Sequence, residues 1–355
     1  MTTKERHVET TMTRTGAPWL SAALAVIAFS APAFSQQDDI ASFYAGKSVR
    51  IIVGVGVGSG YDINARIVAR HIGNHIPGKP QVIVQNQPGA GSLTMTQTLY
   101  NNGPKDGTAI GASHQGIPTA QLLTPEQTRF DPSKLNWIGS SNRETQVTYA
   151  WANVPIKSIE EIRRTKFVVG SQAPGSSQND FPVALNHLFG FGFSVVNGYE
   201  STAKIHLAME RGEVHGIAAV NWSSLTSLQP QWLAEKKINL IGQFGMRPHP
   251  ELKAVPMWLD IAKSPADRQA MELLLSRLET GRPFFMPPDV PSARVTALRR
   301  AFDATMKDPA FLAEADKSKL EVDPMTGEDL AAFVVKLNAT PPDVVARVRD
   351  ALAGK

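Results

Sequence analysis

The fold class is decided by the stretch Val49-Arg50-Ile51-Ile52-Val53-Gly54-Val55-Gly56-Val57-Gly58-Ser59-Gly60-Tyr61-Asp62. Residues 49–53 are rich in β-branched side chains and predict a short strand. The glycine cluster that follows is typical of a tight turn. After it, residues 61–76 carry apolar side chains at helical spacing on one face, namely Ile63, Ile67, Val68 and Ile72. A strand, a glycine turn and a helix in succession predict one unit of an α/β fold.

The same alternation continues along the chain and restarts in its middle. The first part predicts strands at 81–84 and 108–112, a turn at 87–91 and a helix at 92–100. The second part predicts helices at 158–164, 181–189 and 203–211, and strands at 166–170, 194–196, 216–220 and 239–243. Helices are expected at 291–307, 326–337 and from 341 onward. Strands that alternate with helices predict a parallel sheet covered by helices.

Two such α/β parts predict two lobes that move about a hinge, because no low-complexity linker separates them. We expect lobe 1 to be discontinuous and to comprise residues 36–141 plus 249–355, since the C-terminal helices should pack back on it. Lobe 2 is expected to span residues 142–248. The length of 355 residues also favours two domains.

Residues 1–35 have the pattern of a secretory signal peptide. An apolar run at 17–30 follows the basic residues Lys4, Arg6 and Arg14, and the small-residue pattern Ala31-Pro32-Ala33 comes next. The run is shorter than the roughly 20 apolar residues of a membrane-spanning helix. We therefore expect export to the periplasm, with cleavage between Ala33 and Gln36, of a chain that starts at Met1 or Met12.

Composition excludes several classes of protein. The chain has no cysteine, which excludes disulfides, thiol nucleophiles and cysteine-ligated zinc. Its net charge of +4 comes from interspersed charges of both signs, without basic residues interleaved with aromatic ones. We therefore expect no nucleic-acid partner.

Four segments come close to catalytic, cofactor or metal motifs without completing them. Residues 45–48 end like a phosphate-binding loop but lack its first glycine and precede a strand, and the glycine cluster at 54–60 does not complete G-x-G-x-x-G. In Gly111-Ala112-Ser113-His114-Gln115, glutamine replaces the last glycine of a hydrolase nucleophile elbow. His71 and His75 share a predicted helix face but have no third ligand nearby, which favours solvent-exposed histidines. We expect no cofactor, no metal and no enzymatic activity.

Two glycine-rich turns remain, each at the carboxyl end of a strand in the first half of the chain. The first contains Gly58, Ser59, Gly60, Tyr61 and Asp62, and the second contains Gly89, Ala90, Gly91 and Ser92. Turns at helix N-termini direct free N–H groups at an anion, and open α/β sheets bind ligands at such strand ends. The turns therefore predict an anion site. The alternative is that their glycines only make tight turns.

Several segments match one known family at its usual spacing. They are Val49–Val53, Gly58–Asp62 with Ala65-Arg66, Val84–Gly91, Pro104–Thr108, and Tyr199 with Gly212–Val214. In these segments the chain resembles the substrate-binding receptors of tripartite tricarboxylate transporters, the Bug family. The resemblance implies a two-lobed type II periplasmic-binding-protein fold, with a mixed sheet and flanking helices in each lobe, that closes like a Venus flytrap on a carboxylated ligand. It also implies that both turns hold one ligand carboxylate and that the second lobe selects the ligand.

The second lobe departs from the family's usual sequence. Tyr199-Glu200-Ser201 stands where the family usually has Tyr-Lys-Gly, and an acid there would repel a second ligand carboxylate. Alternatively, Glu200 is a solvated residue at a helix start. Trp222 forms either a flat wall for an apolar ligand body or a packing contact at the hinge. Beyond the two turns, the candidate ligand-binding residues are His114, Gln115, Ser176, Ser177, Gln178, Tyr199, Glu200, Thr202, Asn221 and Trp222.

The resemblance implies uptake, in which the protein binds a small carboxylate and passes it to membrane permease subunits. A periplasmic sensor that presents its ligand to a kinase would have the same fold and site, so the sequence leaves this alternative open. A third hypothesis is an α/β enzyme that acts on a carboxylate, but the sequence lacks a nucleophile, metal or cofactor motif. We expect the protein to be a monomer.

Overall fold

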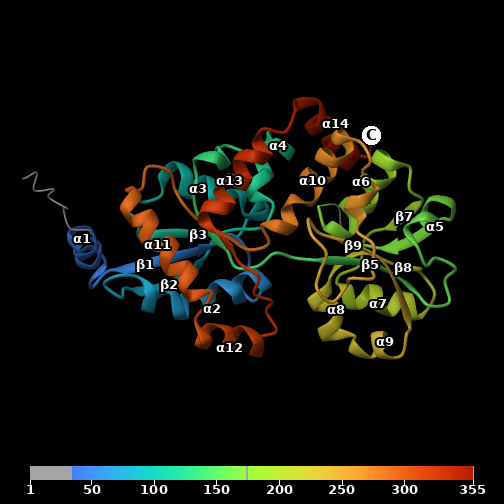
Figure 1. Cartoon of the computed structure of the whole chain (residues 1–355), viewed down its shortest axis with the longest axis horizontal. Coiled ribbons are helices and arrows are strands. Elements are labelled where there is room, and N and C mark those ends of the chain that lie inside the picture. Colours follow the sequence, from blue (N-terminus) through green and yellow to red (C-terminus); the bar gives the residue numbers. More distant parts are fainter. Residues whose placement is uncertain (1–33, 173–174, 355) are drawn as a thin grey trace, which may run out of the picture.

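Two β-sheets form the centres of two lobes that lie side by side (Figure 1). The computed structural model describes residues 34–172 and 175–354. The basic start, the apolar run and the Ala31-Pro32-Ala33 pattern of the predicted signal peptide therefore lie outside the described residues. Each sheet contains parallel and antiparallel pairs and carries helices on both faces. This confirms the predicted two-lobed α/β fold with a mixed sheet in each lobe.

The first sheet contains β1 (Ser48–Val53), β2 (Gln81–Asn86), β3 (Ala109–Ala112), β4 (Asn136–Ser140), β10 (Pro283–Met286) and β11 (Met325–Thr326). Its strand order is β11-β4-β10-β3-β1-β2. β1 pairs in parallel with β2 and β3, as the alternation of strands and helices predicts. β10 and β11 are antiparallel to their neighbours. The N-terminal and C-terminal parts of the chain thus both contribute strands to this sheet.

Helices cover both faces of the first sheet. On one face, α2 (Gly60–His75) and α11 (Ser292–Thr305) bury apolar residues such as Ile67 and Phe302 against β1. On the other face, α3 (Leu93–Asn102) and α13 (Gly327–Asn338) pack around Trp137 and Phe285. The shorter elements of this lobe are α1 (Phe34–Tyr44), α4 (Ala120–Leu123), α12 (Pro309–Lys317), and the 3-10 turns η1 (Ala90–Ser92), η2 (Ile117–Thr119) and η3 (Pro132–Lys134).

The two histidines of α2 contact α12. His71 Nε2 lies 2.7 Å from Glu314 Oε2, and His75 Nε2 lies 2.9 Å from Asp308 Oδ2. The prediction of solvent-exposed histidines is therefore wrong, because each imidazole is partly buried against a carboxylate of the neighbouring helix.

The second sheet contains β5 (Gln146–Trp151), β6 (Phe167–Gly170), β7 (Phe193–Val196), β8 (Gly216–Asn221) and β9 (Ile238–Phe244). Its strand order is β7-β6-β8-β5-β9. β6 is parallel to β7 and β8, and β5 is antiparallel to both of its neighbours. One face carries α7 (Thr202–Glu210), α8 (Trp222–Leu228) and α9 (Pro230–Ala234). The other face carries α5 (Ile159–Arg164), α6 (Ser177–Phe189), α10 (Pro265–Glu279) and the 3-10 turn η4 (Trp258–Ile261).

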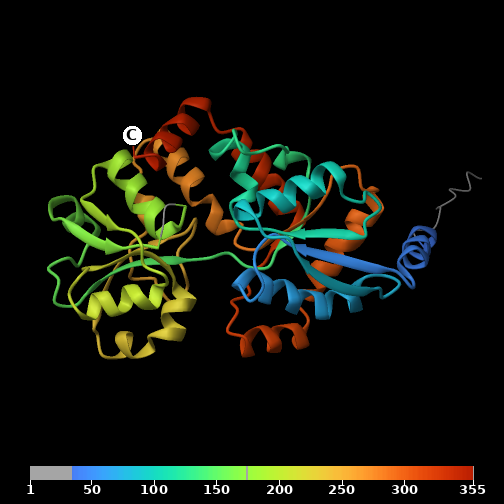
Figure 2. The ribbon, with the colours of Figure 1, turned by 180° about the vertical axis from the view of Figure 1, so that it is seen from behind.

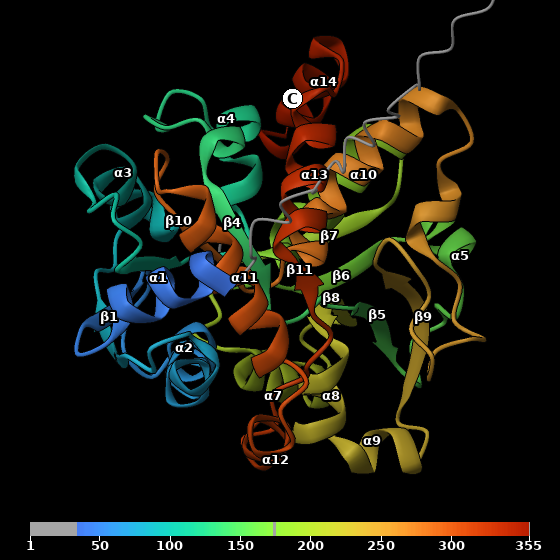
Figure 3. The ribbon, with the colours of Figure 1, turned by 60° about the vertical axis from the view of Figure 1, so that its left-hand side comes forward.

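The last helix differs from the expectation that the C-terminal helices pack on the first lobe. α14 (Pro342–Leu352) buries Ala351 in the same core as Phe181 of α6 and Leu274 of α10. Helices α10, α13 and α14 gather on one side of the molecule (Figure 3), where Leu273, Leu337 and Val348 share a small core. Helices from beyond residue 248 therefore cover the second sheet.

Two neighbouring segments carry the chain between the lobes, residues 141–145 and 279–282, which we call the crossing segments (Figure 2). The chain crosses again between α13 and α14. A backbone hydrogen bond from Ser141 N–H to Arg282 O at 3.3 Å joins the crossing segments, and one from Glu144 N–H to Leu278 O at 2.8 Å joins the first of them to the end of α10. A Cβ on Gly281 would lie 2.7 Å from Asn142 Oδ1, so only glycine permits this close approach.

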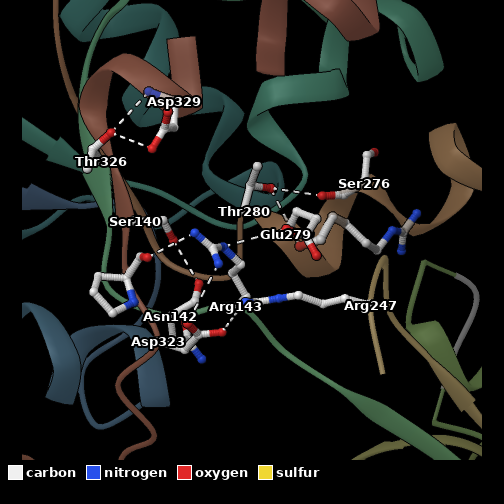
Figure 4. Close-up of polar contacts among 12 residues, drawn as sticks. Ser140, Asn142, Arg143, Arg247, Ser276, Glu279, Thr280, Asp323, Thr326 and Asp329 are labelled. Carbon is white, nitrogen blue, oxygen red and sulfur yellow. Dashed lines mark hydrogen bonds and ion pairs between the residues drawn. The ribbon is translucent and has the colours of Figure 1, made fainter. Parts of the chain in front are cut away.

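Charged side chains surround the crossing segments (Figure 4). Arg143 Nε lies 3.6 Å from Glu279 Oε2, and Arg143 Nη1 lies 3.7 Å from Asp323 Oδ1. Arg247, which follows β9, also pairs with Asp323. These ion pairs tie both crossing segments to the chain that follows β9 and the chain that precedes β11.

Candidate ligand-binding site

A cavity of about 330 Å³ lies between the two lobes, and both crossing segments reach it. The first lobe contributes Gly60, Tyr61, His114 and Gln115, and the second contributes Gln146, Gly175, Ser176, Ser177 and Asn221. Glu144 and Arg282 come from the crossing segments. A second cavity of about 260 Å³ shares Gln146, Ser176, Ser177 and Asn221 and adds Gln178 and Thr202. Because they share four residues, we treat the two cavities as one cleft.

The N-terminus of α2 forms the first-lobe wall of the cleft. Ser59 caps this helix: its hydroxyl accepts a hydrogen bond from Asp62 N–H at 3.3 Å, and its carbonyl accepts one from Ile63 N–H at 2.9 Å. The first four amides of a helix have no acceptor within the helix, so those of Gly60 and Tyr61 remain for a ligand. Gly60 has no side chain to keep a ligand away from them.

Asp62, a predicted ligand-binding residue, is bound to the protein itself and only 1% exposed. Its carboxylate accepts hydrogen bonds from Gly58 N–H at 2.8 Å, from Arg66 Nε at 3.0 Å and from Asn86 Nδ2 at 2.8 Å. Burial acts to raise the pKa of Asp62, but these hydrogen bonds hold it below its usual value. Asp62 and Gly58 thus stabilise the shape of the first turn.

The second predicted turn has a left-handed backbone from Gly89 to Ser92, with φ values of 151°, 45°, 61° and 75°. The Ser92 hydroxyl accepts a hydrogen bond from His114 N–H at 2.9 Å, so this turn supports the loop after β3. Neither cavity is lined by residues 89–92. Direct contact of Gly89, Ala90, Gly91 or Ser92 with a ligand therefore stays a prediction.

The loop after β3 brings His114 and Gln115 to the cleft beside Tyr61. The rings of Tyr61 and His114 lie 5.1 Å apart, and the Tyr61 hydroxyl accepts a hydrogen bond from Gln115 N–H at 3.3 Å. Burial, with a smaller effect of Arg277, lowers the pKa of His114 to about 4, so the ring is neutral at neutral pH. Its Nδ1 accepts a hydrogen bond from Gly116 N–H at 3.2 Å, which leaves Nε2 as the donor.

The N-terminus of α6 forms the opposite, second-lobe wall of the cleft. The Ser176 carbonyl accepts hydrogen bonds from the amides of Asn179 and Asp180 at 3.0 and 2.8 Å, which leaves those of Ser177 and Gln178 for a ligand. Gln178 Nε2 donates to Thr202 Oγ1 at 3.1 Å. Asp180 accepts a hydrogen bond from Gly175 N–H at 2.9 Å and thereby holds the loop before the helix.

An ion pair buried beside the cleft fixes α6 to α10. Arg277 Nη1 lies 3.1 Å from Asp180 Oδ2, and the two side chains are only 13% and 10% exposed. Leaving either charge buried without its partner costs about 3–5 kcal/mol. The pair therefore anchors the N-terminus of α6 at the cleft.

Three polar residues that line the 330 Å³ cavity were not predicted from the sequence, namely Glu144, Gln146 and Arg282. Gln146 Nε2 donates to Asn221 Oδ1 at 2.7 Å, so the predicted site residue Asn221 is oriented by a residue that was not predicted. Arg282 Nη1 is buried and has no hydrogen-bond partner in the described part of the chain. None of the three belongs to a local motif, since their position depends on the crossing of the chain between the lobes.

Tyr199, Glu200 and Trp222 do not line either cavity. Tyr199 packs against the core under α7 to α9, and Glu200 is exposed to solvent. Trp222 is 8% exposed, and its Nε1 donates to Glu251 Oε2 at 2.6 Å. Of the two interpretations of Glu200 the structure favours the solvated one, and of those of Trp222 it favours packing.

Within residues 34–172 and 175–354, no helix is both long and apolar enough to cross a membrane. In the same residues, His, Asp and Glu side chains form no group of three or more that could hold a metal ion.

Comparison with known proteins links the chain to one group of sequences. No family model matches it. It is 25% identical over 327 residues to the UPF0065 protein in the gbd 5'region of Cupriavidus necator, covering 89% of this chain and 91% of that protein. It is 24% identical over 313 residues to a UPF0065 protein of Bordetella pertussis, covering 85% of this chain and 90% of that protein.

Solved structures share the fold over most of the chain. A TctC solute-binding protein from Polaromonas matches with a TM-score of 0.69 and 18% identity, over 85% of this chain and 99% of that one. The periplasmic binding protein BugD matches with a TM-score of 0.58 and 19% identity, over 87% and 98%. An R. palustris protein solved with adipate matches with a TM-score of 0.58 and 17% identity, over 85% and 97%. The chain is thus similar in sequence to the UPF0065 proteins and has the fold of the TctC and Bug periplasmic binding proteins, which confirms the resemblance that its motifs indicate.

Proposed function

We propose that this protein is a periplasmic solute-binding protein that captures a small carboxylate in the cleft between its lobes. The observation that carries the proposal is the pairing of two helix N-termini on opposite walls of one cavity, α2 with Gly60 and Tyr61, and α6 with Ser177. Helix N-termini carry free N–H groups and a partial positive charge, so both walls favour an anion. Arg282 adds a full positive charge to the same cavity.

The chemistry of the lining supports binding rather than catalysis. His114 is neutral and its Nδ1 is occupied by Gly116 N–H, so the ring offers a hydrogen-bond donor rather than a general base. The similarity to solute-binding proteins, one of them solved with adipate, supports the same conclusion. We therefore assign no catalytic residue.

Delivery to membrane permease subunits of a tripartite tricarboxylate-type transporter completes the proposal. The protein acts as a monomer, exported after cleavage between Ala33 and Gln36. Intact-mass measurement of the periplasmic protein tests the cleavage, and loss of ligand uptake after deletion of the gene tests the transport role.

A thermal-shift screen tests ligand binding. Mono-, di- and aromatic carboxylates are compared with their uncharged amides, because a ligand bound only by the folded protein raises its stability. A carboxylate at a hundred times its Kd should add about 2.7 kcal/mol to the free energy of unfolding. The proposal is wrong if no carboxylate raises the midpoint, or if the amides raise it equally.

A further inference from the structure

We infer that the ligand carries a cationic amine beside its carboxylate, with Arg282 binding the carboxylate and Glu144 binding the amine. This inference rests on the proposed function and names the ligand class for the same cleft. It starts from the lining of the 330 Å³ cavity, in which Arg282 supplies a guanidinium and Glu144 supplies a carboxyl group, while the other residues of that lining include no Lys, Arg, Asp or Glu.

Arg282 is placed to bind the ligand carboxylate together with α2. A Cβ on Gly60 would lie 3.7 Å from Arg282 Nη2, so the guanidinium packs beside the first turn of α2. Its Nη1 is buried and has no hydrogen-bond partner among the described residues. The ion pairs found in the described residues do not include Arg282. A buried donor without an acceptor is costly, and a ligand carboxylate would supply the missing acceptor.

Glu144 offers a carboxyl group to the same cavity. The side chains of Asn142 and Asn221 lie close enough to this group to act on its pKa. Burial raises the pKa of Glu144, whereas Arg282 and the two amides act in the opposite direction. A ligand ammonium beside Glu144 would favour its ionised form against the effect of burial. The carboxyl group of Glu144 thus has capacity for a donor from the ligand.

Arg282 and Glu144 influence each other but do not form an ion pair within 4.0 Å. They lie on the two different crossing segments, whose backbones are bonded through Ser141 N–H and Arg282 O. The cavity therefore presents a guanidinium and a carboxyl group at two separate positions, and the two groups do not form an ion pair with each other. An amino acid or a related zwitterion satisfies both, whereas the second carboxylate of a dicarboxylate would approach Glu144 and be repelled.

The test compares matched compounds that differ only by the amine: aspartate and succinate, glutamate and glutarate, γ-aminobutyrate and butyrate, and phenylalanine and its deaminated analogue. Calorimetry on the mature wild-type protein should show that the amine-bearing member of the best-binding pair binds about tenfold or more tightly, as expected for one added charge-assisted hydrogen bond. This comparison needs no variant and so does not depend on the folding of a mutant.

Two charge-removing variants then assign the two roles. Glu144→Gln should weaken the amine-bearing ligand by about ten- to a hundredfold and leave its deaminated partner nearly unchanged, while Arg282→Gln should weaken both. Glu200→Gln removes the same charge as Glu144→Gln from an exposed residue outside both cavities and should change neither affinity.

Two outcomes separate this inference from the proposed function. If deaminated carboxylates bind as well as or better than their amine partners, or if Glu144→Gln leaves the ratio unchanged, the inference is overturned while carboxylate binding stands. If no compound of either kind binds, the proposed function fails and the inference fails with it.

Discussion

Gly60→Ala should raise the stability of the protein and lower its affinity for the ligand. Gly60 opens α2 with a φ angle outside the left-handed region, and its added Cβ would lie 3.7 Å from the nearest atom, Arg282 Nη2, at ordinary contact distance. The folded chain therefore accepts the methyl group, and the lower entropy of the unfolded chain should add about 0.4–1 kcal/mol of stability. Cα–Cβ bonds point toward the N-terminus of a helix, so this methyl group projects toward the bound carboxylate.

The loss of affinity follows from the hydrogen bonds that the methyl group obstructs. Displacing the carboxylate from one helix amide costs about 1.5–3 kcal/mol for a hydrogen bond to a charged group, or about ten- to a hundredfold in Kd. Gly60→Val should cost more than Gly60→Ala. Denaturant unfolding and calorimetry on the same samples measure the two effects, and their opposite signs exclude misfolding as the cause.

Gly56→Ala is the matched control, because Gly56 lies in the same glycine cluster, has no atom within 4 Å of an added Cβ and lines neither cavity. It should leave the affinity unchanged. An unchanged affinity of a folded Gly60→Val variant would refute the assignment of the α2 N-terminus to the ligand carboxylate.

Three further predictions follow from the cleft and its surroundings. The His114 pKa of about 4 lies below the usual value near 6.5, so the unfolded chain binds a proton that the folded chain does not between these pH values. His114 alone should therefore lower the free energy of unfolding by about 3 kcal/mol as the pH drops through this window. Burial lowers the pKa of His206 to about 4 as well, so His114→Gln should remove its own share of the slope in unfolding curves and leave that of His206. Glu200→Lys should leave the ratio of dicarboxylate to monocarboxylate affinity unchanged in calorimetry, since Glu200 is exposed and outside both cavities; a shift toward dicarboxylates would return it to the site. Gly91→Val should lower stability by about 1–2 kcal/mol, because φ is 61° there although the space around its Cβ is open, and an unchanged affinity would remove the second turn from the ligand site.

The first part of the fold could be predicted because its signals are local. The helix expected at 61–76 forms at Gly60–His75, and the strand expected at 81–84 forms at Gln81–Asn86. In contrast, β10 was not predicted. It begins at Pro283 and Pro287 follows it, and no periodic pattern in the sequence shows that the chain returns here to pair with β3. The packing of α14 on α6 was also missed, because an amphipathic helix shows that it has a buried face but not which surface covers it.

The candidate site could be predicted where its residues lie in loops and turns at strand ends. Gly60, Tyr61, Ser176 and Ser177 begin helices at strand ends, and the structure brings them to one cavity. Arg282 has no such signal: it precedes a proline in an apolar segment, and its role depends on contact with a turn far away in the sequence. The role of Trp222 could not be predicted either, because a tryptophan after a strand can form a ligand wall or pack in a core. The structure places Trp222 in a core.

The position of the two charges changes where ligand selection should reside. The family resemblance implies that the second lobe selects the ligand, yet the residues it contributes to the larger cavity are neutral: Gln146, Gly175, Ser176, Ser177 and Asn221. Neutral polar groups distinguish ligands mainly by shape and hydrogen-bond geometry, whereas a charge left without a partner in a buried cleft costs far more. Arg282 and Glu144 lie on the crossing segments, which both lobes share, so we expect the crossing segments to select the ligand by its charge. The second lobe then discriminates among ligands of the right charge by the fit of their remaining atoms.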